Sequence, residues 1–312
     1  MSPRRQPTDQ FTSYYGRPIL KEPTWHALDI AGYIFAGGLA GASSVLAAGA
    51  QHTARPRLER AAKLTALGAI SASVVALVHD LGRPDRFVNM LRVAKPTSPM
   101  SVGSWILSVY GPLAGASAAA NLLGIMPRAG RAAGVGAGIT GSAVATYTAV
   151  LIADTAVPTW HDAHAALPFV FAGSAAASAG GIAAALAPVG ESGPARRMAV
   201  AGAALETAMS LAMERSGKLS AETLHQGKAG RLLRLSKACT AAGAVGLALG
   251  GRSSRAVSAV SGLAVAAGSA LLRFGIFEAG RASTRDPKYV VVPQRERLAA
   301  RQEAASRADT MG

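Results

Sequence analysis

Residues 79–105 read HDLGRPDRFVNMLRVAKPTSPMSVGSW. This polar, proline-containing stretch connects two apolar segments, residues 62–79 and 101–125. A helix needs about 20 mainly apolar residues to cross a bilayer. Each apolar neighbour is close to that length, so the stretch predicts a loop between two membrane helices and decides the fold class of the chain.

The same pattern of apolar segments and short polar connectors continues along the chain. It predicts an all-α integral membrane protein, a bundle of eight transmembrane helices within residues 27–280. The sixth span contains Glu206, and the seventh begins among three basic residues. The predicted spans are residues 27–50, 62–79, 101–125, 132–157, 163–188, 196–214, 232–251 and 256–279.

Polar segments flank the predicted bundle at both ends, residues 1–26 and 281–312. The first of them lacks the apolar core of a signal peptide, so we expect the first span to act as the insertion signal. In the second, Asp286-Pro287 and Val292-Pro293 predict an extended strap, because a residue before proline avoids the helical region. The last dozen residues are compatible with either a helix or a disordered tail.

The composition excludes several classes of protein. Only 16% of the 312 residues are charged, whereas about a quarter is usual for a soluble protein. The formal net charge is +15, and the bases lie between and beyond the apolar segments, which favours a lipid surface over nucleic acid. With Cys239 as the single cysteine, the chain can form no internal disulfide and hold no iron–sulfur cluster alone.

Eight spans would place both termini on one side of the membrane, which we call face A. The connectors around residues 80–100, 155–162 and 215–231 share this face. Face A carries most of the 32 lysines and arginines, so the positive-inside rule favours a cytoplasmic face A in the cell membrane. The opposite face holds the remaining bases: Arg55, Arg57, Arg60, Lys63, Arg128, Arg131, Arg196, Arg197, Arg252 and Arg255.

Titratable side chains of several spans gather near face A. A quinone headgroup requires such a site, because its two oxygens accept hydrogen bonds and its reduction consumes two protons. An apolar cleft between helices would take the isoprenoid tail. Each residue alone could also be an interfacial side chain that meets headgroups or water. The quinone-binding candidates are Asp29, Tyr33, His79, Asp80, Tyr147 and Asp154, and His161 and His164 lie on the same face.

Three further ionisable residues are candidates for a proton path. A charge at the centre of a membrane helix costs about 2.5–3.5 kcal/mol on insertion scales, so Glu206 must be neutral, paired or hydrated. Arg273 and Glu278 close the predicted last span at face A. All six histidines fall at span ends or in loops, which disfavours haem. We expect no metal in this chain, and we assign no catalytic residue.

The connector resembles the loop after the second membrane helix in the NrfD/polysulfide reductase membrane-subunit family. The shared residues are Asp80-Leu81-Gly82-Arg83-Pro84 and Ser98-Pro99-Met100-Ser101-x-Gly103-Ser104-Trp105. Further likeness lies in residues 37–41, 147–151 and 273–280, so we expect the resemblance to extend from Trp25 to the C-terminal strap. The resemblance implies an eight-helix subunit without haem.

The resemblance also implies partners and a quinone site. A ferredoxin-like iron–sulfur subunit would dock on this chain and carry a molybdopterin subunit, and menaquinone or ubiquinone would exchange electrons with its clusters. By position, the family's quinone site corresponds to Asp29, Tyr33 and Tyr147. The polysulfide reductase branch has Asn and His where this chain has Asp29 and Tyr33, which leaves the hydrogen-bonding pair open. We expect the docking residues to be Arg83, Arg86, Arg92, Lys95 and Trp105, and formate to be the partner's substrate.

Two other functions compete with this hypothesis. A secondary transporter would show internal repeats, broken helices and a midplane site. Glu206 and the glycine-rich spans fit that description loosely, but the polar residues gather at one end of the bundle. A purely structural anchor would bind partners without binding quinone.

Overall fold

The computed structural model describes residues 19–83 and 89–311, with side chains to residue 307. Among these residues, seven helices are long and apolar enough to cross a membrane. The chain is therefore a multi-pass membrane protein. The helices are α1 (Ala27–His52), α2 (Pro56–Asp80), α4 (Pro99–Leu123), α5 (Pro127–Ala153), α6 (Pro158–Asp162), α7 (Leu167–Leu186), α8 (Gly193–Glu214), η1 (Leu219–Leu224), α9 (Gly227–Leu249), α10 (Arg255–Arg285) and α11 (Lys288–Met311).

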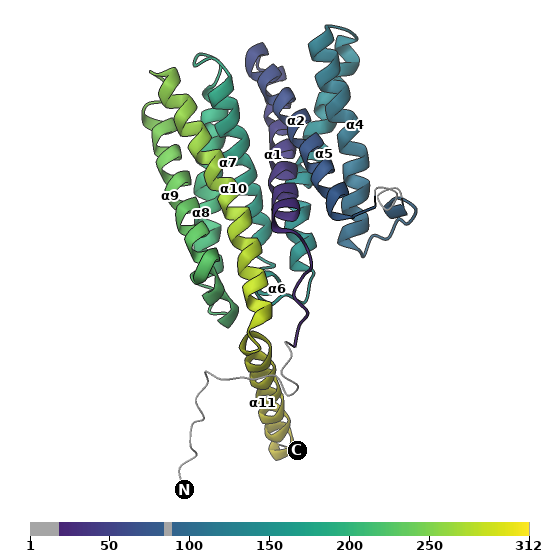
Figure 1. Cartoon of the computed structure of the whole chain (residues 1–312), viewed down its shortest axis with the longest axis vertical. Coiled ribbons are helices and arrows are strands. Elements are labelled where there is room, and N and C mark those ends of the chain that lie inside the picture. The colour runs from purple at the N-terminus through teal and green to yellow at the C-terminus, as the bar shows by residue number, and fades with distance from the viewer. Residues whose placement is uncertain (1–18, 84–88, 312) are drawn as a thin grey trace.

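The long helices form two groups of four. Helices α1, α2, α4 and α5 pack against one another, and α7, α8, α9 and α10 make the second group. The groups meet where α1 lies against α7 and α10 and where α5 touches α7. Figure 1 shows the groups side by side, with α11 extending beyond the bundle at the end where α10 finishes. That lower end of Figure 1, where α1 and α4 begin and α2 ends, is face A.

The sixth predicted span, α8, does not reach the apolarity of a membrane helix, whereas the seventh, α9, does. Length and composition therefore support seven of the eight predicted spans, and they do not support α8. Helix α8 nevertheless packs along α7. It buries Glu206 and exposes Leu205 and Leu211 on its outer side.

Small residues let the helices approach closely. A Cβ atom on Gly41 would collide with the backbone of Gly141, so α1 and α5 touch at this point. Gly138 faces Ser44 and Ala48 one turn away. Prolines stand in the first turn of most long helices, where the missing N–H costs no hydrogen bond.

The prediction of an extended C-terminal strap is wrong. Helix α10 runs six residues past the predicted end at 279, to Arg285, and α11 follows at once. Asp286 alone keeps the extended conformation that precedes proline (φ −107°, ψ 113°). Pro287 stands immediately before the first residue of α11, and its carbonyl accepts a hydrogen bond from the Val291 N–H at 2.9 Å.

Candidate quinone site and the loop motif

Two of the predicted site residues form a pair at the face-A end of α1 and α2. The Nδ1 atom of His79 lies 2.9 Å from Oδ2 of Asp29. The Asp29 side chain is 15% exposed and the His79 side chain 75% exposed. Asp80 follows at the end of α2 and is partly exposed. The pair thus combines a largely buried carboxylate with an exposed imidazole.

An apolar hollow adjoins the imidazole. It has a volume of about 450 Å³ and is lined by Val74, Val75, Val78, His79 and Gly82. The three valines lie on one side of α2. Gly82 has a φ of +68° and turns the chain just beyond the helix, which a residue with a side chain rarely does. The hollow therefore places apolar walls next to a polar group at the membrane surface.

Tyr147 lies inside the same half of the bundle. Its side chain is buried, and its hydroxyl has no hydrogen-bond partner among the described residues. A Cβ atom on Gly103 would overlap the Tyr147 ring, so the glycine of α4 makes the space for this ring. An unpaired buried hydroxyl costs free energy unless water or a ligand satisfies it. The Tyr147 hydroxyl is thus available to donate a hydrogen bond to a ligand or a water molecule.

Tyr33 is also buried, and it lies one helical turn from Asp29 on α1. Its carbonyl accepts a hydrogen bond from the Ser73 hydroxyl at 3.1 Å. On the next turn, a Cβ atom on Gly37 would contact both Ser73 and Val144. Since Val144 precedes Tyr147 by one turn on α5, Tyr33 and Tyr147 lie at similar depth below the surface pair.

The loop motif has a structural explanation. The Ser101 hydroxyl donates to the Val93 carbonyl at 2.7 Å and accepts from the Lys95 N–H at 3.0 Å. The Trp105 indole donates to the same carbonyl at 3.4 Å. These bonds tie the connector to the first turns of α4. Gly103, between them, admits Tyr147, so one motif both closes the loop and shapes the site.

A family model described as polysulphide reductase NrfD matches residues 18–221. This chain belongs to that family. A sequence search of curated proteins finds no match for it. NrfD-family proteins are membrane subunits of polysulphide-reductase-like complexes, which typically include iron–sulfur and molybdenum subunits. The match ends in η1, short of the C-terminal region to which we expected the resemblance to extend.

Several predicted residues of this NrfD-family chain lie away from the Asp29–His79 pair. Asp154 is exposed just after α5, and His161 and His164 are exposed around α6. Among the predicted docking residues, Arg83, Arg92, Lys95 and Trp105 are exposed on or beside the connector, while Arg86 falls outside the described residues.

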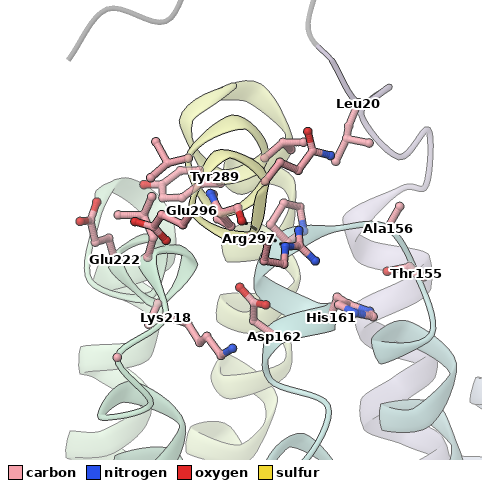
Figure 2. Close-up of a pocket in the computed structure, with 18 of the residues that line it drawn as sticks. Leu20, Thr155, Ala156, His161, Asp162, Lys218, Glu222, Tyr289, Glu296 and Arg297 are labelled. Atoms are coloured by element: carbon pink, nitrogen blue, oxygen red, sulfur yellow. Dashed lines mark hydrogen bonds between the residues drawn. The ribbon is translucent and has the colours of Figure 1, made fainter. Parts of the chain in front are cut away.

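A larger hollow lies at face A beneath α11, and the sequence did not predict it (Figure 2). Its volume is about 1070 Å³. Charged groups of both signs surround it, among them Asp162, Lys218, Glu222 and Arg297. Lys288 of α11 bonds Glu222 of η1 at 3.0 Å and fixes one wall. An extended strap would not have formed this hollow, which is why the prediction missed it.

Two of the proton-path candidates, Glu206 and Arg273, lie in the interior, whereas Glu278 lies elsewhere. Glu206 and Arg273 are 4% and 3% exposed and attract each other electrostatically inside the second group of helices. Arg273 also donates to the Phe171 carbonyl at 2.8 Å and stacks on the Phe171 ring. Arg273 is therefore an interior residue, and the expectation that it closes the last span is wrong, because α10 continues to Arg285.

Glu278 has a different environment. It forms a 2.8 Å ion pair with Lys228 at the edge of the bundle. Glu206 keeps one carboxylate oxygen without a partner among the described residues, while the other accepts from Thr240 at 3.3 Å. Across the described residues, no group of three His, Cys, Asp or Glu side chains could hold a metal ion.

Proposed function

We propose that this chain is the quinone-reactive membrane subunit of an oxidoreductase complex, exchanging electrons between a docked iron–sulfur subunit and membrane quinone. The observation that supports it most is the Asp29–His79 pair beside an apolar hollow. Quinone headgroups accept hydrogen bonds, and their tails prefer apolar walls. Family membership supports the same reading, because NrfD-family proteins are associated with quinone-interacting subunits.

The residues divide the chemistry between them. Bound quinone supplies the redox chemistry, taking up two electrons and two protons. The His79 imidazole can donate a hydrogen bond at the surface, and the contact with Asp29 orients its ring. The unpaired Tyr147 hydroxyl is a second donor at greater depth. Valines of α2 exclude water from the side where the tail would lie.

The docking surface in this proposal is face A near the connector. Arg83, Arg92, Lys95 and Trp105 would contact the iron–sulfur subunit, which in turn carries a molybdopterin subunit. We propose menaquinone as the quinone and formate as the substrate of that distant subunit. Glu206, with Arg273, is proposed as a proton-bearing pair in the second group of helices.

Substitution in the intact complex tests the site. We expect Asp29→Asn and Tyr147→Phe to leave the complex assembled but to lower quinone turnover by about 10²-fold or more, since positioned proton donors typically contribute about 10²–10⁴-fold. Asp154→Asn is the matched control, because this exposed carboxylate lies on the same face away from the pair. Unchanged turnover in both variants would refute the site.

A mild-detergent pull-down separates the competing functions. The tagged chain would be purified from its native membrane and assayed for iron, molybdenum or tungsten, and quinone. Metals together with quinone support the proposal, and the co-purified large subunit identifies the substrate class. If the chain is purified without partner, metal or quinone, a transporter is favoured. If it is purified with metals but without quinone, a structural anchor is favoured.

A further inference from the structure

A charged pair with a buried lysine lies in the first group of helices, at the end opposite face A. Lys63 is seven residues into α2, about 10 Å along the helix axis, and only 5% of its side chain is exposed. Its Nζ lies 2.7 Å from Oε1 of Glu59 and 3.4 Å from Oε1 of Gln51. A buried lysine is costly unless it is paired or hydrated, and the proposed quinone site does not involve it.

The outer side of this pair reaches the surface. Glu59 is partly exposed and accepts a hydrogen bond from the Asn121 side chain at 3.4 Å. Gln51 donates to the Arg131 carbonyl at 3.2 Å. Gln51, Glu59 and Asn121 come from three different helices and are all partly exposed. They form a polar entrance from the opposite face to Lys63.

A small cavity lies on the inner side of Lys63. Its volume is about 10 Å³, and its polar wall consists of Ser44, Lys63 and Ser117. The Ser117 hydroxyl is buried and has no partner among the described residues. A cavity of roughly 10–15 Å³ holds one water molecule where polar partners are present. The unpaired hydroxyl and the lysine supply those partners, so the cavity fits one water.

Glycine at position 134 lets these groups converge. A Cβ atom there would lie 2.9 Å from the Ser117 hydroxyl and 3.0 Å from Oε1 of Gln51. The absence of a side chain on α5 therefore leaves room for polar groups from α1 and α4. Beyond the cavity, the Ser44 and Tyr110 hydroxyls are hydrogen bonded at 2.9 Å.

Lys63, Ser117, Ser44 and Tyr110 form a line of polar groups, and this polar line ends at Tyr110. One turn from Ser44 toward face A, the backbones of Gly41 and Gly141 meet and close the space between α1 and α5. Further toward face A, the Ser73 hydroxyl donates to the Tyr33 carbonyl. The line is thus open toward the opposite face and closed toward the quinone site in this conformation.

We propose that Lys63, Ser117, Ser44 and Tyr110 form a hydrated proton inlet from the face opposite the docking surface. The Lys63 ammonium passes a proton to the cavity water and regains one through Glu59 and the entrance. Each hydroxyl accepts a proton on a lone pair as it releases its own, so protons can move as far as Tyr110 without another reactant, and they go no further while the Gly41–Gly141 contact is closed. The charged group facing Lys63 is Glu59 of the same helix, while α1 presents Gln51 and Ser44, α4 presents Ser117 and Asn121, and α5 presents Gly134.

The use of these protons at the quinone rests on the proposed function, but the hydration of the inlet does not. High-resolution cryo-electron microscopy of the intact complex tests hydration directly. We expect an ordered water between Lys63, Ser117 and Ser44, and its loss in the Ser117→Ala variant. A dry cavity in the unmodified protein would overturn the proposal whether or not the complex turns over quinone.

Proton transfer is tested in proteoliposomes by measuring proton uptake on each side during quinone turnover. We expect Lys63→Met and Ser117→Ala to lower uptake from the opposite side severalfold, with electron transfer in detergent unchanged. Ser43→Ala is the matched control, because Ser43 is buried on α1 but does not line the cavity. If the complex does not assemble with Lys63→Met, proton uptake by the milder Ser117→Ala variant decides whether the inlet carries protons.

Unchanged proton uptake in the assembled variants would overturn the inlet as a proton route. Absence of quinone turnover in the unmodified complex would instead refute the proposed function, and the hydration result would then decide the inlet alone.

Discussion

Gly103 shows how a single residue determines local packing in this structure. It lies in the SPMSxGSW motif, and the Tyr147 ring occupies the space that its side chain would fill. We expect Gly103→Ala to displace Tyr147 and to destabilise the protein by about 1–3 kcal/mol, the usual range for overpacking. Quinone turnover should fall with it. Thermal unfolding and turnover of the purified complex measure both effects.

The control is Gly111→Ala on the same helix, where an added Cβ meets no atom within 4 Å. Equal stability of the two variants would show that α4 can move away from Tyr147. It would remove the packing explanation for the glycine in the motif.

The sequence was enough to place several candidate residues on face A but not to predict their environments. The spacing of Asp29 and His79 near two helix ends was enough to predict that they share face A, and the structure brings them into contact. For Lys63, the sequence indicated only a base of the opposite face, since burial depends on which side of α2 packs inward. Arg273 was misplaced for a similar reason, because apolarity fades before the helix ends.

Among the elements, the segment before α1 is tied to the end of α10. Glu22 accepts hydrogen bonds from Arg285 at 2.7 Å and Arg281 at 2.8 Å. The bond from Arg285 lowers the pKa of Glu22 most, the bond from Arg281 lowers it further, and partial burial opposes them. A lowered pKa means that the attachment is complete above the ordinary value of 4.5 and is lost as the pH falls through the lowered value.

This attachment can be followed by tryptophan fluorescence. Trp25 stacks on Trp160 with ring centroids 6.1 Å apart, so we expect the emission to change when acid releases the segment. The pH step should occur below 4.5 and be absent in Glu22→Gln. A step of equal size in that variant would place the pH response elsewhere, for example in general acid unfolding.

The C-terminal element shows where local sequence rules fail. Two Xaa-Pro pairs predicted an extended strap, yet only Asp286 is extended. Pro293 lies inside α11. The rule for residues before proline is a preference, and the Lys288–Glu222 contact between α11 and η1 adds a tertiary interaction that no local pattern contains. The hollow of Figure 2 depends on this contact and was therefore not predictable.

At the scale of the whole molecule, the crossing of α8 decides the topology. Seven helices satisfy the apolar criterion and α8 does not, but α8 packs along α7 and turns Glu206 inward. Glu206, one of the four charged residues of α8, is therefore buried inside the bundle. If α8 crosses the membrane, its two flanking loops lie on opposite sides, and α11 shares a side with the connector after α2.

Cysteine labelling tests this topology, because Cys239 is the only native cysteine. In a Cys239→Ser background, we expect Gly190→Cys and Gly217→Cys to react with a membrane-impermeant thiol reagent from opposite sides. Both glycines have open space around their Cβ positions, so neither substitution should disturb the fold through crowding, although the φ of +70° at Gly217 adds local strain. Ser306→Cys on α11 should match Gly217→Cys. Labelling of both loops from one side would mean that α8 does not cross, and that face A as defined here does not lie on one side of the membrane.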